Sequence, residues 1–344
     1  MNLDSFVILD YNDSRWMEFI SSHPKSCLFH HPAWVGMVAH SYGYHPFLAA
    51  VINPQEKIIA GLPIIETLTL TRKRRWVSLP FTDHCQPLYL DEEGFQQLGE
   101  GILEESRRQK IIDLELRWKY LNLDFLHSSE FVVTTVELNE DKAKIAARIK
   151  SNHRRKLRVA ASRGVEVERG TSLKHMKAFY QLQVETRRRL GVPSQPWRFF
   201  QHLQKEVLEP GLGFISLAHR DGKYLAGVVY LQWNQTLIYK YSNTSEEART
   251  LYASDLLVWD GIEWGCENGF LILDLGRSSM KNEGLRRYKK RWAAEEKPLC
   301  YSRNYEYHPN GFKYKLTPIM KSVINYSPKW VCRLSGELCY RFFA

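Results

Sequence analysis

Apolar residues recur along the chain at two spacings, and each spacing predicts a different element. Alternation with a period of two is typical of strands, and recurrence every three to four residues is typical of amphipathic helices. In the first part of the chain the pattern predicts strands at 6–10, 47–52, 57–67 and 111–117. It predicts helices at 15–21, 32–41 and 94–110. Asn53-Pro54-Gln55-Glu56 reads as a hairpin turn between the second and third strands.

The second part of the chain repeats this order of elements. The predicted helices cover 142–163, 173–190, 197–208 and 254–268. The predicted strands cover 214–220, 224–233, 236–243 and 270–277. Asp221-Gly222 forms the turn of a second hairpin. The pattern therefore predicts a mixed α/β (α+β) protein in two parts.

Short matching motifs support a duplication. The second strand of each hairpin opens with Ala-Gly, and Gly227 lies 166 residues after Gly61. Each part also ends on an Asp-Leu strand that closes in arginine, and Asp274 lies 161 residues after Asp113. Similar offsets are expected for two copies of one supersecondary unit, and chance matching of short motifs is the alternative. We expect two halves that superpose, at 1–141 and 142–310, followed by a tail at 311–344.

The composition indicates a globular protein without a membrane-spanning helix. With 344 residues and 44% hydrophobic content, the chain is long enough for two cores. Charged residues make up 25%, and apolar stretches such as 58–65 are far shorter than the roughly 20 residues that cross a bilayer. The start Met1-Asn2-Leu3-Asp4 lacks the features of a secretion signal, so we expect a cytoplasmic location.

Cysteine spacing argues against a zinc or redox motif, because no close CxxC pair is present. The six residues are Cys27, Cys85, Cys266, Cys300, Cys332 and Cys339. We expect buried thiols, no metal and no bound organic cofactor.

The formal net charge of +10 favours an anionic partner, such as nucleic acid, a phosphorylated substrate or a lipid headgroup. A basic surface that serves solubility alone is the alternative. The helix predicted at 142–163 concentrates this charge, since Arg154, Arg155 and Arg158 lie off its apolar stripe and form a candidate anion-binding surface. A solvated helix face explains the same residues equally well. His153 lies on the apolar stripe, so we interpret it as a packed core residue.

The stretch 273–301 carries the most informative chemistry. Its strand ends in Gly276-Arg277, and ligands in open α/β sheets gather outside the carboxyl ends of strands. A basic aromatic segment, Tyr288-Lys289-Lys290-Arg291-Trp292, follows after a short loop. Lysines and tyrosines arranged in this way can orient an anionic substrate and stabilise an oxyanion that develops during acyl transfer. On the residues alone, a basic surface helix packed over Trp292 is the simpler interpretation.

This segment resembles the C-terminal halves of the Fem-type aminoacyltransferases and of the related GNAT-like proteins of exopolysaccharide clusters. Those proteins carry an aromatic-Lys-x-x-aromatic-Gly signature, which stands here as Tyr288 to Trp292 with Ala293 in place of the glycine. The likeness extends over nearly the whole chain through Ala226-Gly227-Val228-Val229-Tyr230, Tyr239-Lys240-Tyr241-Ser242, Ser162-Arg163-Gly164-Val165, His31-Pro32-Ala33-Trp34 and Leu316-Thr317-Pro318.

The resemblance implies two tandem GNAT-like subdomains, that is, the acyl-CoA N-acyltransferase fold with mixed central sheets. It implies transfer of an acyl group, often an amino acid from aminoacyl-tRNA, to an amine of a cell-wall precursor. The signature lysine, which stabilises charge during this transfer, maps to Lys289. The predicted substrate-binding residues are Arg187, Tyr241, Arg277, Tyr288 and Trp292. No dedicated general base is implied, so groups of the substrate itself would move the proton.

Two departures from related proteins bear on the acyl donor. Ordinary GNAT acetyltransferases hold the pyrophosphate of acetyl-CoA on a glycine-containing loop that opens a helix. The corresponding link at 242–253 has no glycine, which argues against conventional acetyl-CoA binding in the second half. The connection at 191–195 is too short for the long helical arm of some Fem proteins, which argues against tRNA engagement by such an arm.

Three functions follow as hypotheses. The first is an N-acyltransferase or aminoacyltransferase that uses aminoacyl-tRNA and modifies an anionic cell-wall or exopolysaccharide precursor. The second keeps the fold but takes an acyl thioester, either acyl-CoA or acyl carrier protein. The third is a non-catalytic binder of nucleic acid or of a membrane surface. Its basis is a tail that mixes aromatic and basic residues, namely Trp330, Tyr340, Phe342, Phe343, Lys321, Lys329, Arg333 and Arg341. We expect this tail to pack on the domain, with a peripheral contact to the inner membrane as the alternative.

Overall fold

The computed structural model describes residues 4–69, 72–120, 123–138, 141–304, 321–322 and 324–342. These residues form two compact units. Unit 1 holds the described residues of 4–132 together with 298–304 and 342, and unit 2 holds those of 133–297 and 321–341. The predicted division at 141 stays a prediction, and the predicted boundary at 310 lies outside the described residues.

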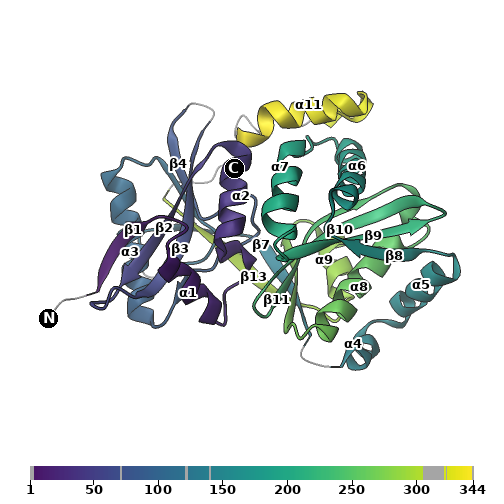
Figure 1. The fold of residues 1–344 in the computed structure, drawn as a ribbon, viewed down its shortest axis with the longest axis horizontal. Helices are drawn as coiled ribbons and strands as arrows, with labels where there is room; N and C mark the ends of the chain where they lie inside the picture. The colour runs from purple at the N-terminus through teal and green to yellow at the C-terminus, as the bar shows by residue number, and fades with distance from the viewer. Residues whose placement is uncertain are drawn as a thin grey trace. The chain divides into compact units, whose positions relative to one another are not determined.

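Unit 1 is a mixed sheet with three helices (Figure 1). Its strands are β1 (Ser5–Leu9), β2 (His45–Ile52), β3 (Ile58–Leu68), β4 (Arg74–Val77), β5 (Leu88–Tyr89), β6 (Asp113–Leu116), the first part of β7 (Leu126–Glu137) and the last part of β13 (Glu295–Arg303). Its helices are α1 (Ser14–Ser22), α2 (Pro32–Tyr42) and α3 (Glu92–Arg108), with a 3-10 turn at η1 (Leu28–His30). The strand order is β1-β2-β3-β4-β6-β13-β7, and β5 pairs with β3.

Unit 2 is also a mixed sheet, in the order β8-β9-β10-β11-β12-β7 (Figure 1). Its own strands are β8 (Glu166–Gly170), β9 (Gly213–Arg220), β10 (Lys223–Trp233), β11 (Thr236–Thr244) and β12 (Ile272–Ser279). Its helices are α4 (Lys142–Arg148), α5 (Ser151–Ser162), α6 (Leu173–Leu190), α7 (Trp197–His202), α8 (Ala253–Glu267), α9 (Glu283–Lys290) and α11 (Lys329–Cys339). Short helical turns are η2 (Leu203–Leu208), η3 (Glu247–Arg249) and η4 (Tyr340–Phe342). One apolar core lies between this sheet, α5 and α8, and it includes Trp292.

The two units repeat one topology. The series β1-β2-β3-β4-β6 and β8-β9-β10-β11-β12 each run through three antiparallel pairings and end on a parallel one. A Cβ at Gly61 would lie 2.6 Å from the Trp16 ring of α1, and a Cβ at Gly227 would lie 3.0 Å from the Phe179 ring of α6. In each unit the hairpin glycine therefore makes room for a ring from a preceding helix. The mixed α/β fold with a repeated order of elements is confirmed.

The single helix predicted at 142–163 is wrong, because two helices occupy these residues. Ile149 ends α4 in an extended conformation (φ −70°, ψ 133°), and Lys150 precedes α5 (φ −55°, ψ 140°). The Arg154 guanidinium donates to the carbonyls of Ala146, Ala147 and Ile149 at 2.9, 3.0 and 3.1 Å. This side chain supplies donors for carbonyls that lose their helical partners at the break.

The apolar pattern also does not predict β4, β7, β8 and β13. β8 is short and charged, and all its residues are exposed or half-buried at the edge of its sheet. The first residues of β13 are mostly exposed and charged, and only its second half is buried. The helix predicted at 197–208 is present, but its second half, η2, is a π-helical turn.

The helix α11 packs against α6 of unit 2 (Figure 1). Arg188 Nε donates to the Ser327 carbonyl at 2.7 Å. A Cβ at Gly336 would lie 1.7 Å from the Ser194 carbonyl oxygen, so glycine is required for this close approach. Phe343 of the predicted tail lies outside the described residues.

No helix in the described ranges is both long and apolar enough to cross a membrane. Within the same ranges, no group of three or more His, Cys, Asp and Glu side chains is placed to hold a metal ion. Five cysteines are free thiols, namely Cys27, Cys85, Cys266, Cys300 and Cys332.

Candidate functional site

The parallel strands β11 and β12 pair over three positions, the last of which joins Ile238 to Asp274. Beyond this pairing β11 continues to Thr244 and β12 continues to Ser279. Ligands of open α/β sheets bind beyond the carboxyl ends of parallel strands. The segments that follow Ile238 and Asp274 are therefore the first candidate for a site in unit 2.

A β-bulge turns the side chains of β11 at this point. Val229 of β10 pairs with Tyr241, whereas its neighbour Tyr230 pairs with Tyr239, so Lys240 is an extra residue. The ring of Tyr239 lies 5.6 Å from that of Tyr230, on the side of the sheet covered by α8. The ring of Tyr241 lies 5.9 Å from that of Phe199 in α7. The bulge therefore directs two aromatic rings of one strand to opposite faces of the sheet.

Lys289 is buried at the end of β12, although its side chain is a cation. It is 7% exposed, and its Nζ donates to the carbonyls of Gly276 at 2.8 Å and Arg277 at 3.0 Å. Gly276 has a φ of 74°, in the left-handed region that favours glycine. Asn282 caps the first turn of α9 through the N–H of Leu285, and this helix carries Lys289 to the strand. The ammonium therefore holds the backbone of β12 where that strand has left β11.

Tyr288 and Trp292 flank Lys289 in the chain and lie in the covered interior beside it. Trp292 is fully buried, and the Tyr288 hydroxyl oxygen is inaccessible to water. Burial raises the pKa of Tyr288 well above its usual value, so the phenol is neutral at pH 7. The rings of Tyr288 and Trp292 meet edge to face at 6.3 Å. The two rings thus form an apolar wall at the C-terminal end of α9, the helix that carries Lys289.

A buried histidine and aspartate complete this wall. His153 of α5 is fully buried, as predicted, with its ring 5.4 Å from that of Trp292. Its Nδ1 lies 3.0 Å from a carboxylate oxygen of Asp255. Burial lowers the pKa of His153, and the nearby Asp255 opposes that shift. Asp255 is not predicted from the sequence, and its one signal is an acid in the first turn of an apolar helix.

The predicted anion-binding arginines of α5 have different environments. Arg154 is committed to the carbonyls at the end of α4, as described above. Arg155 and Arg158 are exposed on the same helix. Two of the three predicted cations are therefore accessible to an anion, and the third supports the backbone.

Arg187 and Tyr241 lie on the other face of the sheet, which α6 and α7 cover. An Arg187 guanidinium nitrogen lies 3.4 Å from the side-chain oxygen of Gln195. The structure thus divides the predicted site into two groups. Lys289, Tyr288 and Trp292 gather with the backbone of Arg277 on one side of β12 and β11, and Arg187 and Tyr241 lie across the sheet.

Unit 1 contains a charged cluster that the sequence does not predict. Glu115 of β6 is buried, and its oxygens lie 3.1 Å from Arg75, 3.1 Å from Arg117 and 3.0 Å from Arg303. Burial alone would raise the pKa of Glu115, but the three guanidinium groups outweigh it and lower this pKa to about 2. The sequence signal was the Asp-Leu strand that closes in arginine, but the partner Arg303 is too distant in the chain for a local pattern to find.

Comparison with known proteins identifies the fold. A family model described as an acetyltransferase (GNAT) domain matches residues 147–290. The solved structure of FemX has a TM-score of 0.69 at 13% identity, covering 87% of this chain and 96% of FemX. L-PGS from Bacillus licheniformis has a TM-score of 0.58 at 12% identity, covering 93% of this chain and 99% of that one. A tandem GNAT protein from the clavulanic acid biosynthesis pathway has a TM-score of 0.54 at 11% identity, over 89% and 100%. The tandem GNAT fold expected from the sequence is confirmed.

One curated relative adds sequence similarity. The UDP-N-acetylmuramoylpentapeptide-lysine N(6)-alanyltransferase of Weissella viridescens is 27% identical over 113 residues. The match covers 33% of this chain and 33% of that enzyme. The GNAT model spans the segment that holds β11, β12, α9 and Lys289.

Proposed function

We propose that this chain, a FemAB-like protein with a tandem GNAT fold, transfers an acyl or aminoacyl group to an amine of a cell-wall or exopolysaccharide precursor. The observation that carries this proposal is the buried Lys289, fixed beside the diverging ends of β11 and β12 within the GNAT domain. Acyl transfer generates an oxyanion as the amine attacks the carbonyl carbon. A preorganised cation in an apolar surrounding stabilises such a charge.

In this mechanism each group has a defined task. The substrate amine forms a bond to the acyl carbon, the donor oxygen or sulfur leaves, and the amine proton passes to groups of the substrates. Lys289 stabilises the developing negative charge, while its bonds to the Gly276 and Arg277 carbonyls keep the ammonium in place. Tyr288 and Trp292 exclude water on one side. Arg277, Arg155 and Arg158 supply positive charge for an anionic precursor. Arg187 supplies it from the other face of the sheet, where Tyr241 adds a phenol hydroxyl.

The start of α8 favours a donor other than acetyl-CoA. A pyrophosphate binds to a helix N-terminus through backbone N–H groups and the positive end of the helix dipole. In this chain the first turn of α8 contains the carboxylate of Asp255, which is 7% exposed and repels an anion. Tyr252, which precedes α8, has a φ of 55°, in the left-handed region. Because this residue is not a glycine, the backbone there has little freedom to adapt to a pyrophosphate. Aminoacyl-tRNA is therefore our first donor, and an acyl thioester bound elsewhere is the second.

The relative from Weissella viridescens suggests the acceptor to test first, because its name specifies a lysine of UDP-N-acetylmuramoylpentapeptide. We place the reaction in the cytoplasm. The decisive experiment incubates the full chain with that precursor and, in separate reactions, with a pool of aminoacyl-tRNA or with acyl-CoA. Mass spectrometry of the precursor then detects an added aminoacyl or acyl group. The proposed transfer is contradicted if no donor modifies the precursor and no donor modifies an amino sugar polymer offered as the acceptor instead.

A further inference from the structure

The helix α11 presents an apolar surface to water on the side that does not pack. Residues of a helix are about 100° apart around its axis, so Trp330 and Leu334 lie opposite Cys332 and Gly336. Cys332 and Gly336 are buried against unit 2. Trp330 is 61% exposed and Leu334 is 49% exposed, and Tyr326, shortly before α11, is 88% exposed. An amphipathic helix with its second apolar face uncovered indicates a further contact.

Positive charge accompanies this apolar face. The residues from Lys321 to Arg341 include four cations and one acid, Glu337. The Glu337 carboxylate accepts a hydrogen bond from the backbone N–H of Trp197 at 3.0 Å, so it faces the domain. Lys329 and Arg333 lie one helical turn apart and are both exposed, and Lys329 Nζ also lies 2.6 Å from the Glu185 carboxylate of α6. A partner for this face is therefore anionic as well as apolar.

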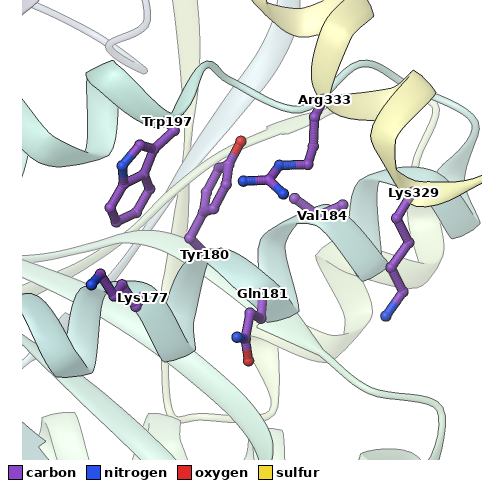
Figure 2. Close-up of a pocket in the computed structure, with 7 residues that line it drawn as sticks. All are labelled: Lys177, Tyr180, Gln181, Val184, Trp197, Lys329 and Arg333. Atoms are coloured by element: carbon purple, nitrogen blue, oxygen red, sulfur yellow. The ribbon is translucent and has the colours of Figure 1, made fainter.

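Lys329 and Arg333 also border a cavity of about 340 Å³ between α11, α6 and the start of α7. Figure 2 shows Arg333 reaching from α11 toward Tyr180, with its guanidinium carbon 5.4 Å from the ring centroid. The ring of Trp197 lies 4.9 Å from that of Tyr180. Lys177 adds a third cation at the rim. The cavity therefore has aromatic side chains in its wall and lysine and arginine side chains at its rim.

We propose that the outer face of α11 docks on a bilayer that contains anionic phospholipid. Trp330 and Leu334 enter the boundary between headgroups and acyl chains, where tryptophan is favoured. Lys329 and Arg333 bind lipid phosphates, and the adjoining cavity accepts one headgroup. Interfacial helices combine an apolar face with lysine and arginine in the same way. A helix of 11 residues gives a weak, reversible contact, so binding depends on both the apolar and the anionic parts of the membrane.

This partner explains the surface better than nucleic acid does. Binding of nucleic acid phosphates would use the cations. It would not explain why Trp330 and Leu334 are exposed beside them. The inference does not depend on the proposed acyl transfer, since membrane binding is measured without substrates.

The test is co-sedimentation of the full chain with vesicles of equal parts phosphatidylglycerol and phosphatidylcholine, and with vesicles of phosphatidylcholine alone. We expect binding to the anionic vesicles only. Lys329→Gln/Arg333→Gln should weaken it by about twenty-five-fold, since each cation near an anionic surface contributes about fivefold. Trp330→Ser/Leu334→Ser should weaken it at least as much. Higher salt should weaken binding of the unaltered protein, because it screens the phosphates.

Matched variants test the position of the effect. Lys174→Gln/Lys205→Gln removes two exposed cations elsewhere in unit 2, and Leu173→Ser removes a side chain that is 43% exposed. Both should bind as the unaltered protein does. The conservative Trp330→Phe should retain binding, but brominated lipid should quench less of the protein's tryptophan fluorescence. This variant keeps the test decisive if the serine variant unfolds.

Three results overturn the proposal. The first is no binding of the unaltered protein to anionic vesicles, and the second is equal binding by the α11 variants and the matched controls. The third is a dimer in solution that Trp330→Ser/Leu334→Ser converts to a monomer, because the face is then covered by a second copy of the chain.

Discussion

Glu115 is the residue whose environment most directly predicts a stability effect. Its carboxylate compensates three guanidinium groups inside unit 1, so Glu115→Gln leaves them close together with no negative charge among them. Removing one partner of a buried charged cluster destabilises a protein by about 3–5 kcal/mol. We expect that loss in urea-induced unfolding at pH 7. Glu56→Gln is the control, because Glu56 is 74% exposed and its pair with Arg15 contributes little.

The same residue predicts a pH dependence. The pKa of Glu115 falls from an ordinary 4.5 to about 2 in the folded chain, so the unfolded chain binds a proton more readily. The stabilisation is therefore complete above about pH 4.5 and is lost as the pH falls toward 2. Melting temperatures measured through this window should fall less steeply for Glu115→Gln than for the unaltered protein. Parallel curves would show that the three arginines do not control the charge of Glu115.

Lys289 tests the proposed chemistry at the same scale. If its ammonium stabilises charge that develops only in the transition state, Lys289→Met should lower the single-turnover rate by about a hundredfold with little change in precursor affinity. The variant should also melt earlier, because the Gly276 and Arg277 carbonyls lose their donor. Separate measurement of the rate and of the dissociation constant distinguishes the two effects.

Lys290 is the internal control for that experiment. It is adjacent in sequence, but its Nζ lies 2.7 Å from Glu296 and its side chain is 51% exposed. Arg286 holds the same carboxylate, so Lys290→Met leaves the local charge balance largely in place. Turnover by Lys290→Met should be nearly unchanged. Equal losses in both variants would indicate a general effect of surface charge, and full turnover by Lys289→Met would remove Lys289 from the mechanism.

At the scale of elements, the break between α4 and α5 shows the limit of the apolar pattern. His153 and Ala160 keep the helical spacing across 142–163, and neither proline nor glycine marks the interruption. Arg154 stabilises the break through hydrogen bonds to backbone carbonyls. The spacing of apolar residues does not predict contacts of this kind. The hairpins, α6 and α8 were predictable because apolar spacing agrees there with turn residues and, in α6, with the glycine that ends the helix. β13 was not, because its partners are distant in sequence and its first residues are charged.

Arg154 and Arg155 form a matched pair for testing this element. Arg154→Gln should destabilise unit 2 by about 1–3 kcal/mol, the cost of leaving carbonyls at a helix end without a donor. Arg155→Gln removes the same charge from an exposed neighbour and should change stability by less than about 0.5 kcal/mol. Hydrogen exchange of the α4 amides gives the location of the effect. Equal stability of the two variants would mean that water replaces the Arg154 donor at no cost.

At the scale of the whole molecule, the sequence predicts the duplication but not how the chain completes each copy. The repeated Ala-Gly and Asp-Leu motifs lie within each half, so a linear pattern detects them. The chain leaves unit 1 along β7 and returns to it with residues 298–304, which no local pattern indicates. The same holds for the candidate site. Lys289 is proposed from a local signature and stays a prediction, whereas Asp255 and His153 meet only through the fold.

This returning segment predicts that residues 1–141 do not form a complete unit. The fragment would lack Ser302, whose Oγ accepts from the N–H of Tyr120 at 2.9 Å, and Asn304, whose side-chain oxygen accepts from the N–H of Leu114 at 2.8 Å. It would also lack Arg303, which binds Glu115. We expect the fragment to unfold at a lower urea concentration than unit 1 does in the whole chain, and a peptide of residues 295–304 to restore part of the difference. The same peptide with Arg303→Gln should restore less, because it cannot form the ion pair between Arg303 and Glu115. If the fragment alone is as stable as unit 1 in the whole chain, β13 is dispensable and 1–141 is a domain in its own right.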